Sequence, residues 1–180
     1  NKDEYLPLHP LDGVKIIDLT GYIAGSYAVS LLADLGAEVV KVERPGTGDD
    51  ARAFGPFLEN GQSAYFASIN RGKKSIALDL KDDTDRETFL DLVDRADVLV
   101  ENFRAGTMQK LNLSAESLRH RNPRLIYAAL SGFGHAGTHT DRAAYDVVVQ
   151  ALSGLMSITG SGRGQSVRVG TSISDILTGI

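Results

Sequence analysis

Residues 14–44 read VKIIDLTGYIAGSYAVSLLADLGAEVVKVER, and the order of apolar and glycine residues in this stretch decides the fold class. A short apolar run predicts a strand at Val14, Ile16, Ile17 and Leu19. Ser26 is the expected N-cap of the helix that follows, and the apolar stripe of this helix comprises Ala28, Leu31, Leu32 and Leu35. Gly36 stands where a left-handed residue often ends a helix, and a second strand is predicted at Val39, Val40 and Val42. Strand, loop, helix and strand in this order form the unit from which parallel sheets are built.

The rest of the chain continues the alternation of strands and helices. Further strands are predicted at residues 75–80, 98–100, 125–130 and 167–169, the third of them buried. Helices are predicted at residues 63–70, 84–96, 114–121, 145–152 and 174–180, and a capping box at residues 84–87 opens the second of these. Residues 45–61 are expected to form a long loop, and residues 1–12 a polar lead-in. The predicted fold class is α/β: a Rossmann-like, doubly wound, mostly parallel sheet with helices on both faces.

The composition excludes several classes of function. The chain has 180 residues, 42% of them hydrophobic and 23% charged, as in ordinary globular domains. The net charge of -4 does not favour nucleic-acid binding, and the lack of cysteine excludes disulfides and thiolate sites. No apolar run has membrane-spanning length and the start does not resemble a signal peptide, so a cytoplasmic location is expected. The chain lacks an initial Met and stops inside an apolar run, so we expect it to be part of a longer protein.

Two nucleotide-binding interpretations fit the sequence poorly. In a dinucleotide-binding domain, Glu43 would bind a ribose and Arg44 a 2′-phosphate, but the first loop has only Gly21 and Gly25 instead of three spaced glycines. Residues 71–75 lack the upstream glycine of a phosphate-binding loop, so a solvated basic turn is expected there.

The candidate chemical groups are few. Asp175 follows a run of small residues at the start of a predicted helix, where the helix N-terminus would keep its carboxylate ionised, or where it would simply cap the helix. Asn102 and Phe103 directly follow a strand, so they are expected either to contact a ligand or to anchor the loop. His135 and His139 lack the spacing of a metal site and are expected on the surface, so no metal is predicted.

Several collinear segments resemble the family III CoA-transferases, the group that includes formyl-CoA transferase, carnitine CoA-transferase and α-methylacyl-CoA racemase. The longest matching segments are PLDGVKIIDLT at residues 10–20, LADLGAEVVKVERPG at 32–46, NRGKKSIALDLK at 70–81 and ADVLVENFR at 96–104. NPRLIY at 122–127 and SGFG at 131–134 also match, as do YD at 145–146, QA at 150–151 and SG at 153–154. The resemblance covers nearly the whole chain.

The resemblance implies a site and a reaction. Asp175 corresponds to the catalytic carboxylate, which attacks an acyl-CoA to form an acyl-aspartyl anhydride and then an aspartyl-CoA thioester before an acceptor acid takes the CoA. CoA is implied to lie along Ile23, Ala24, Arg44, Leu78, Lys81, Asn102, Phe103, Arg104 and Lys110. The four basic residues among these would pair with the CoA phosphates, and no metal is required.

The resemblance also implies alternatives and an assembly. Tyr145 stands where the racemases have a catalytic histidine, which favours the transferase branch, and Ala143 replaces a lysine of formyl-CoA transferase, which disfavours formyl or oxalyl substrates. Members of the family form interlocked homodimers of longer chains. Residues 1–180 would then be the N-terminal Rossmann-like CoA-binding domain, without the second domain and the returning C-terminal segment. Alone, this domain would be an inactive CoA-binding fragment.

Overall fold

A single parallel sheet organises the computed structural model, which describes residues 9–180. Most of the predicted lead-in, residues 1–8, lies outside the described part. The strands are β1 (Lys15–Asp18), β2 (Glu38–Glu43), β3 (Lys73–Ala77), β4 (Val98–Glu101) and β5 (Ile126–Ala129). Their order is β3-β2-β1-β4-β5 and every neighbouring pair is parallel, which confirms the predicted fold class.

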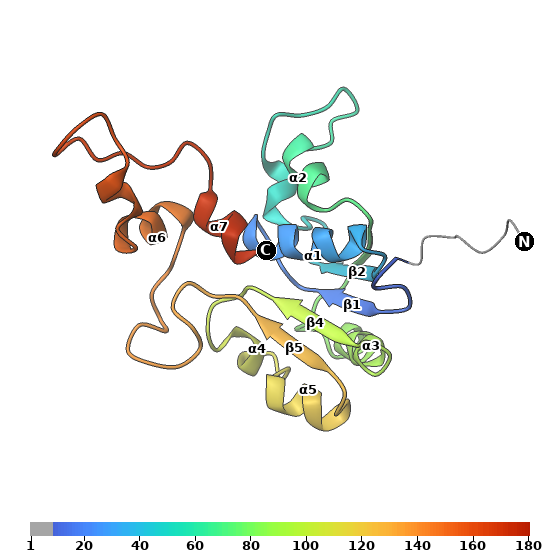
Figure 1. Ribbon diagram of the computed structural model, residues 1–180. Helices are drawn as coiled ribbons and strands as arrows, with labels where there is room; N and C mark the ends of the chain where they lie inside the picture. The colour runs from blue at the N-terminus through green and yellow to red at the C-terminus, as the bar shows by residue number, and fades with distance from the viewer. Residues whose placement is uncertain (1–8) are drawn as a thin grey trace, which may run out of the picture.

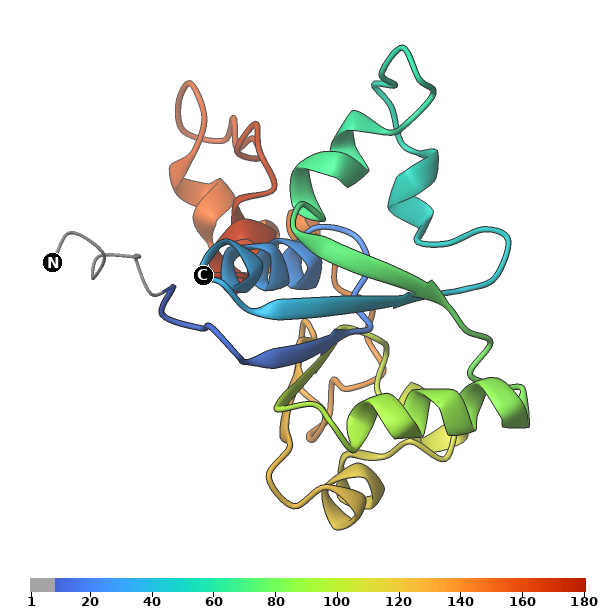
Figure 2. The ribbon, with the colours of Figure 1, turned by 90° about the vertical axis from the view of Figure 1, so that its right-hand side faces the viewer.

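Helices cover both faces of this sheet (Figures 1 and 2). The α-helices are α1 (Ala24–Asp34), α2 (Ala64–Ile69), α3 (Asp83–Val93), α4 (Thr107–Lys110), α5 (Ala115–Arg121), α6 (Asp146–Leu152) and α7 (Ile173–Thr178). Two short 3-10 helices, η1 (Asp50–Ala53) and η2 (Leu155–Ile158), lie in the connections. Helix α1, with α7 packed against it, lies on one face, and α3 and α5 lie on the other.

The alternation of side chains along β1 separates two hydrophobic cores. Ile17 joins Phe89 of α3 and Leu118 of α5 in the larger core, whereas Ile16 joins Val29 of α1 in the smaller one. All five of these side chains are at most 3% exposed. Adjacent residues of a strand point to opposite faces, so burial of both confirms that each face of the sheet is covered.

The prediction for α1 was wrong in two details. The helix begins at Ala24, two residues before the predicted cap Ser26, whose buried carbonyl accepts a hydrogen bond from Lys73 Nζ at 2.9 Å. The fully buried positions are Gly25, Ser26, Val29 and Ser30, while Leu35 of the predicted stripe is 44% exposed. Small polar residues are buried here because neighbouring segments satisfy their hydrogen bonds, as the carbonyl of Ile69 does for the Ser30 hydroxyl.

Other predicted boundaries also moved. Asp82, not the predicted capping box, caps α3, because its carboxylate accepts from the backbone N–H groups of Thr84 and Asp85. Strand β5 is an edge strand in which Ile126 is 62% exposed, so the prediction of a buried strand was wrong. Residues 167–169 form no strand, although the Val167 N–H bonds to the carbonyl of Thr159. Helix α4 was not predicted, and the other predicted helices are present.

Beneath the loop that follows β1 lies a buried charge cluster, formed by Asp18, Lys41, Asp49 and Lys73. The Lys73 ammonium donates to Asp18 at 2.8 Å, and the Lys41 ammonium lies 3.0 Å from a carboxylate oxygen of Asp49. Each of these side chains is at most 3% exposed. The predicted solvated turn at residues 71–75 is therefore wrong for Lys73, which faces the interior.

Removal of one charge from this cluster should destabilise the protein strongly. Lys73→Met leaves the Asp18 carboxylate buried with Lys41 as its remaining cation, 3.8 Å away, and we expect a loss of about 3–5 kcal/mol in the free energy of unfolding. Urea denaturation of the chain measures this loss. Arg71→Met is the matched control, because Arg71 pairs with Asp34 on the surface and its removal should cost no more than about 1 kcal/mol. Equal losses in both variants would contradict the prediction.

Candidate functional site

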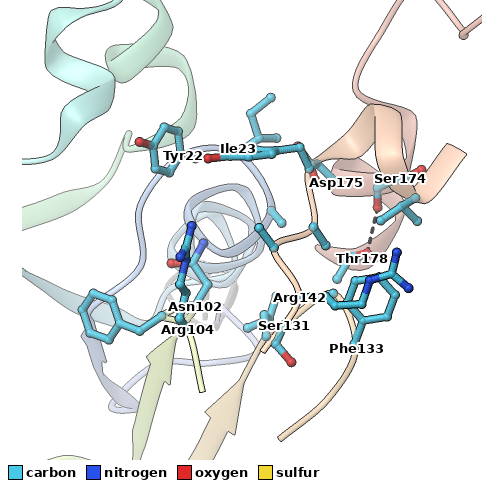
Figure 3. Close-up of a pocket in the computed structure, with 18 of the residues that line it drawn as sticks. Tyr22, Ile23, Asn102, Arg104, Ser131, Phe133, Arg142, Ser174, Asp175 and Thr178 are labelled. Atoms are coloured by element: carbon cyan, nitrogen blue, oxygen red, sulfur yellow. Dashed lines mark hydrogen bonds between the residues drawn. The ribbon is translucent and has the colours of Figure 1, made fainter. Parts of the chain in front are cut away.

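A pocket of about 340 Å³ lies where the loops after β1 and β4 meet (Figure 3). These adjacent strands carry connections to opposite sides of the sheet, and ligands of open parallel sheets bind at such a switch point. Asn102, directly after β4, holds the first loop: its Oδ1 accepts from the Gly21 N–H at 2.8 Å and its Nδ2 donates to the Gly21 carbonyl at 2.7 Å. Both polar atoms of the Asn102 side chain therefore bond to Gly21, so Asn102 anchors the loop, which is one of the two roles expected from the sequence.

Asp175 reaches this first pocket from α7 and is half-buried. The N–H of the preceding residue, Ser174, donates to Asp146 Oδ1 at 2.8 Å, so Asp146 caps this end of the helix. Within residues 9–180, no group donates a hydrogen bond to the Asp175 carboxylate. Burial, reinforced by the negative charge of Asp146, raises the pKa of Asp175 above its ordinary value. Burial and the charge of Asp146 therefore outweigh any stabilisation that the helix N-terminus gives to this carboxylate.

Two tyrosines form the opposite wall of the first pocket. Burial, with the negative charge of Asp175 as a further cause, raises the pKa of Tyr65 on α2 to about 12, so its hydroxyl stays protonated at neutral pH. Tyr22 has a left-handed backbone with φ of 58° and donates from its hydroxyl to Asp50 at 3.1 Å. This side of the pocket therefore offers neutral hydroxyl groups and aromatic surface.

A second pocket of about 420 Å³ lies beyond the ends of β2 and β3. Its lining is mostly apolar and includes Leu19, Val42, Leu78, Leu80 and Phe103. Phe103 also lines the first pocket, so its ring is shared between the two. At the rim, the exposed guanidinium of Arg44 pairs with Asp50. The arrangement suits a long ligand with an apolar middle and an anionic part.

Glu43 is not available to bind a ribose, which removes the dinucleotide interpretation. Arg52 donates to it from Nε and Nη2, both at 2.7 Å, and the Ser75 hydroxyl donates at 2.6 Å. Burial alone would raise the pKa of this carboxyl, but the bonds from Arg52, Ser75 and the Asp49 N–H outweigh it and hold the pKa at about 2. Glu43 is thus a structural anion.

The structure places the predicted site residues in three groups. The first pocket is lined by Ile23, Ala24, Asn102, Phe103, Arg104 and Asp175. The second is lined by Arg44, Leu78, Lys81 and again Phe103. Lys110 lines neither pocket and is exposed at the end of α4. Sequence reasoning missed Tyr65, Arg142, Asp146 and Gln150, of which only the last two carried a signal, a helical spacing of four residues.

The described residues contain neither a cluster of metal-ligating side chains nor a helix that could span a membrane. No group of three or more histidine, aspartate or glutamate side chains in residues 9–180 is arranged to hold a metal ion. The helices seen in this part of the chain are all too short or too polar to cross a membrane. His139, one of the two loop histidines, packs its ring against the edge of Phe133 with a centroid distance of 6.0 Å.

The sequence matches one protein family over most of its length. The model of CoA-transferase family III matches residues 11–180. Acetyl-CoA:oxalate CoA-transferase of Acetobacter aceti is 50% identical over 175 residues, which cover 97% of this chain and 45% of that protein. Succinyl-CoA:glutarate CoA-transferase of Homo sapiens is 45% identical over 173 residues, which cover 96% of this chain and 40% of that protein. The chain therefore spans less than half the length of these relatives.

Solved structures agree with the sequence match. A CAIB/BAIF family protein from Brucella suis superposes with a TM-score of 0.89 at 43% identity, covering 94% of this chain and 46% of that one. The hypothetical protein Rv3272 from Mycobacterium tuberculosis has a TM-score of 0.86 at 42% identity, covering 95% and 47% of the two chains. The fold described above is shared with the matching part of each of these proteins, which is less than half of its length.

The low pKa of Glu43 predicts a specific acid sensitivity. Its folded-state pKa of about 2 lies below the ordinary value of 4.5, so its contribution to stability is fully present above pH 4.5 and is lost as the pH falls towards 2. Glu43→Gln should therefore flatten the decline of unfolding free energy over this window, as measured by urea denaturation at a series of pH values. Glu59→Gln, at an exposed carboxyl, should keep the wild-type slope. An unchanged slope in Glu43→Gln would show that other groups govern acid unfolding.

Proposed function

The chain belongs to CoA-transferase family III, and from this membership we propose that the whole protein moves CoA from an acyl-CoA thioester to a carboxylic acid, with Asp175 as nucleophile. The observation that carries the assignment of the nucleophile is the state of the Asp175 carboxylate. It is half-buried, lines the first pocket and, within residues 9–180, accepts no hydrogen bond. A carboxylate that is poorly solvated loses little stabilisation when it attacks a carbonyl carbon.

The proposed position of CoA uses both pockets. The apolar second pocket accepts the adenine and part of the pantetheine, and the chain passes Phe103 into the first pocket, where the thioester meets Asp175. Arg44, Lys81, Arg104 and Lys110 are the proposed partners of the phosphate groups. Lys110 lines neither pocket, but it lies on the short helix α4, and Thr107 of the same helix lines the second pocket.

The proposed reaction proceeds by acyl exchange on Asp175. A carboxylate oxygen of Asp175 attacks the acyl carbonyl, and the C–S bond breaks to give an acyl-aspartyl anhydride and CoA thiolate. The thiolate attacks the aspartyl carbonyl, which releases the donor acid and leaves an aspartyl-CoA thioester. The acceptor carboxylate attacks the aspartyl carbonyl of this thioester, and the C–S bond breaks to give a second mixed anhydride and CoA thiolate. The thiolate then attacks the acceptor carbonyl of this anhydride, which forms the acceptor acyl-CoA and releases the Asp175 carboxylate.

Arg142 is the proposed contact for an anionic acceptor. It lines the first pocket together with Asp175, and its guanidinium carbon lies 5.3 Å from the ring centroid of Phe133. No carboxylate of residues 9–180 pairs with it. An uncommitted guanidinium beside a nucleophile suits the far carboxylate of a dicarboxylic acid, and the relatives named above act on oxalate and glutarate.

We also propose that residues 1–180 are the N-terminal CoA-binding domain of a longer chain that forms an interlocked homodimer in the cytoplasm. Coverage of only 45% of the relative from Acetobacter aceti supports the longer chain. Exposed apolar side chains on η2 and α6 support further contacts, since Ile158 is 84% exposed and Leu152 is 59% exposed.

Replacement of Asp175 tests the central proposal. Asp175→Ala in the full-length protein should abolish transfer of CoA from an acyl-CoA to a free acid, because no carboxylate remains to form the anhydride. CoA binding, measured by calorimetry, should persist within about threefold because Asp175 supplies no cation for the phosphates. Hydroxylamine added to the wild-type protein with acyl-CoA should label the Asp175 peptide, as detected by mass spectrometry.

Two results would contradict this proposal. Transfer that survives Asp175→Ala would remove the nucleophile. Incorporation of deuterium at the α-carbon of a 2-methylacyl-CoA in deuterated water, without any acceptor acid, would indicate racemase chemistry instead. Tyr145, which stands at the position of the racemase histidine, is 64% exposed at the start of α6.

A second variant tests the acceptor site. Arg142→Gln should raise KM for a short dicarboxylic acceptor by about 10- to 100-fold, because a charge-assisted pair is lost. KM for the acyl-CoA should stay within about threefold. Arg168→Gln, an exposed arginine outside both pockets, is the matched control. An unchanged KM for the acceptor in Arg142→Gln would assign its recognition to other residues.

A further inference from the structure

Two side chains of α6 hold the segment that leads into α7. Asp146 and Gln150, one helical turn apart, form what we call the α6 clamp. Gln150 is completely buried: its Oε1 accepts from the Val169 N–H at 2.8 Å, and its Nε2 donates to Asp146 Oδ2 at 2.6 Å. The other oxygen of Asp146 accepts from the Ser174 N–H at 2.8 Å. One pair of side chains therefore binds both ends of residues 169–174.

The held segment has little else to fix its conformation. Residues 170–172 are Gly, Thr and Ser, and they belong to no helix or strand. Gln150 Nε2 also donates to the Thr171 carbonyl at 3.3 Å, which adds a third contact from the clamp. Because Gly170 has wide backbone freedom and no helix or strand holds residues 170–172, the side-chain hydrogen bonds from α6 restrict this segment.

We propose that Asp146 and Gln150 are positioning residues for the nucleophile, which set the place of Asp175 in the first pocket by holding the backbone up to Ser174. The inference rests on the proposed function, because it assumes that Asp175 attacks the thioester. Asp175 directly follows Ser174, whose N–H is held by Asp146, so a shift of the Ser174 backbone also shifts the Asp175 side chain. A displacement of about 1 Å at a reacting group can cost about 100-fold in rate.

The clamp also places a second negative charge beside the nucleophile. The titratable and charged residues that share the pocket with Asp175 are Tyr22, Tyr65, Arg104, Asp141, Arg142 and Tyr145, and Asp146 lies behind it on α6. Helix α1, the other element packed against α7, approaches it through Ala24, Tyr27 and Ala28. Asp146 is the carboxylate that raises the pKa of Asp175 after burial. Movement of this charge away from Asp175 should therefore lower the pKa of the nucleophile.

The experiment compares a broken clamp with a rebuilt one in the full-length protein. Asp146→Ala should lower kcat for CoA transfer by about 100-fold and change KM for the acyl-CoA by less than about threefold. The double variant Asp146→Asn with Gln150→Glu keeps the acceptors for the Ser174 and Val169 N–H groups and reverses the bond between the two side chains, and it loses only the longer bond to the Thr171 carbonyl. It should recover kcat to within about tenfold of wild type, and the acidic limb of its pH–kcat profile should lie at lower pH.

The matched control is Asp82→Ala, which removes a carboxylate cap from the start of α3; Asp82 lines neither pocket, although it directly follows Lys81 of the second. It should reduce stability and leave kcat of the folded protein unchanged. The proposal is overturned if Asp146→Ala lowers kcat no more than Asp82→Ala does, or if the double variant recovers no activity.

A readout without catalysis separates this inference from the proposed function. In the CoA-free protein, hydrogen exchange at the Ser174 amide should be at least about tenfold faster in Asp146→Ala than in wild type, because the amide loses its acceptor. Unchanged exchange would overturn the clamp by itself. Faster exchange in Asp146→Ala, combined with transfer that survives Asp175→Ala, would overturn the proposed function and its nucleophile, and with them the role of the clamp in catalysis.

Discussion

The buried charge cluster is the constraint on which the ligand-facing end of this fold depends. Asp18, at the end of β1, accepts from Lys73 of β3 and from the Thr20 N–H at 2.8 Å, and Lys41 of β2 donates to the Thr20 carbonyl. Three parallel strands and the first residue of the loop are thereby joined through side chains. Buried ions are stable only with partners, so each of these groups restricts the others. The loop that lines the first pocket is consequently rigid at its base.

The strand order and a few side-chain contacts then place the loops that line the first pocket. The strand order brings the ends of β1 and β4 together, and Asn102 fastens one loop to the other through Gly21. Helix α7, although distant in sequence, packs against α1 and brings Asp175 to the same place (Figure 3). A rigid polar frame therefore surrounds Asp175, the proposed nucleophile, whose carboxylate accepts no hydrogen bond within residues 9–180. Such a frame restricts where a thioester can lie while it leaves the attacking oxygen free.

The sequence predicted the sheet better than the helix ends and the polar interior. A short apolar run such as residues 14–19, rich in β-branched residues and followed by a glycine-containing loop, is too short for a typical helix, so its length and flanks favour a buried strand. Ser26 failed as a cap because its hydrogen bonds depend on Thr20 and Lys73, which only the folded chain brings near. Spacing alone did not distinguish Asp175 from an ordinary cap, and the family resemblance was needed to single it out. Its setting depends on Asp146 and Tyr65, 29 and 110 residues away in sequence.

The pairing of Arg44 with Asp50 places a carboxylate of the protein beside the cation at the rim of the second pocket. An approaching anion must replace a carboxylate that the protein already supplies, so its gain is only the difference between the two pairings. A phosphate, with more charge and more acceptor oxygens than a carboxylate, gains from this exchange, whereas a simple carboxylic acid gains nothing. Asp50 also accepts a hydrogen bond from the hydroxyl of Tyr22, which lines the first pocket. If an anion takes Arg44 from Asp50, this carboxylate loses its cation while it still contacts Tyr22. An anion at this rim would therefore compete with a carboxylate of the protein itself.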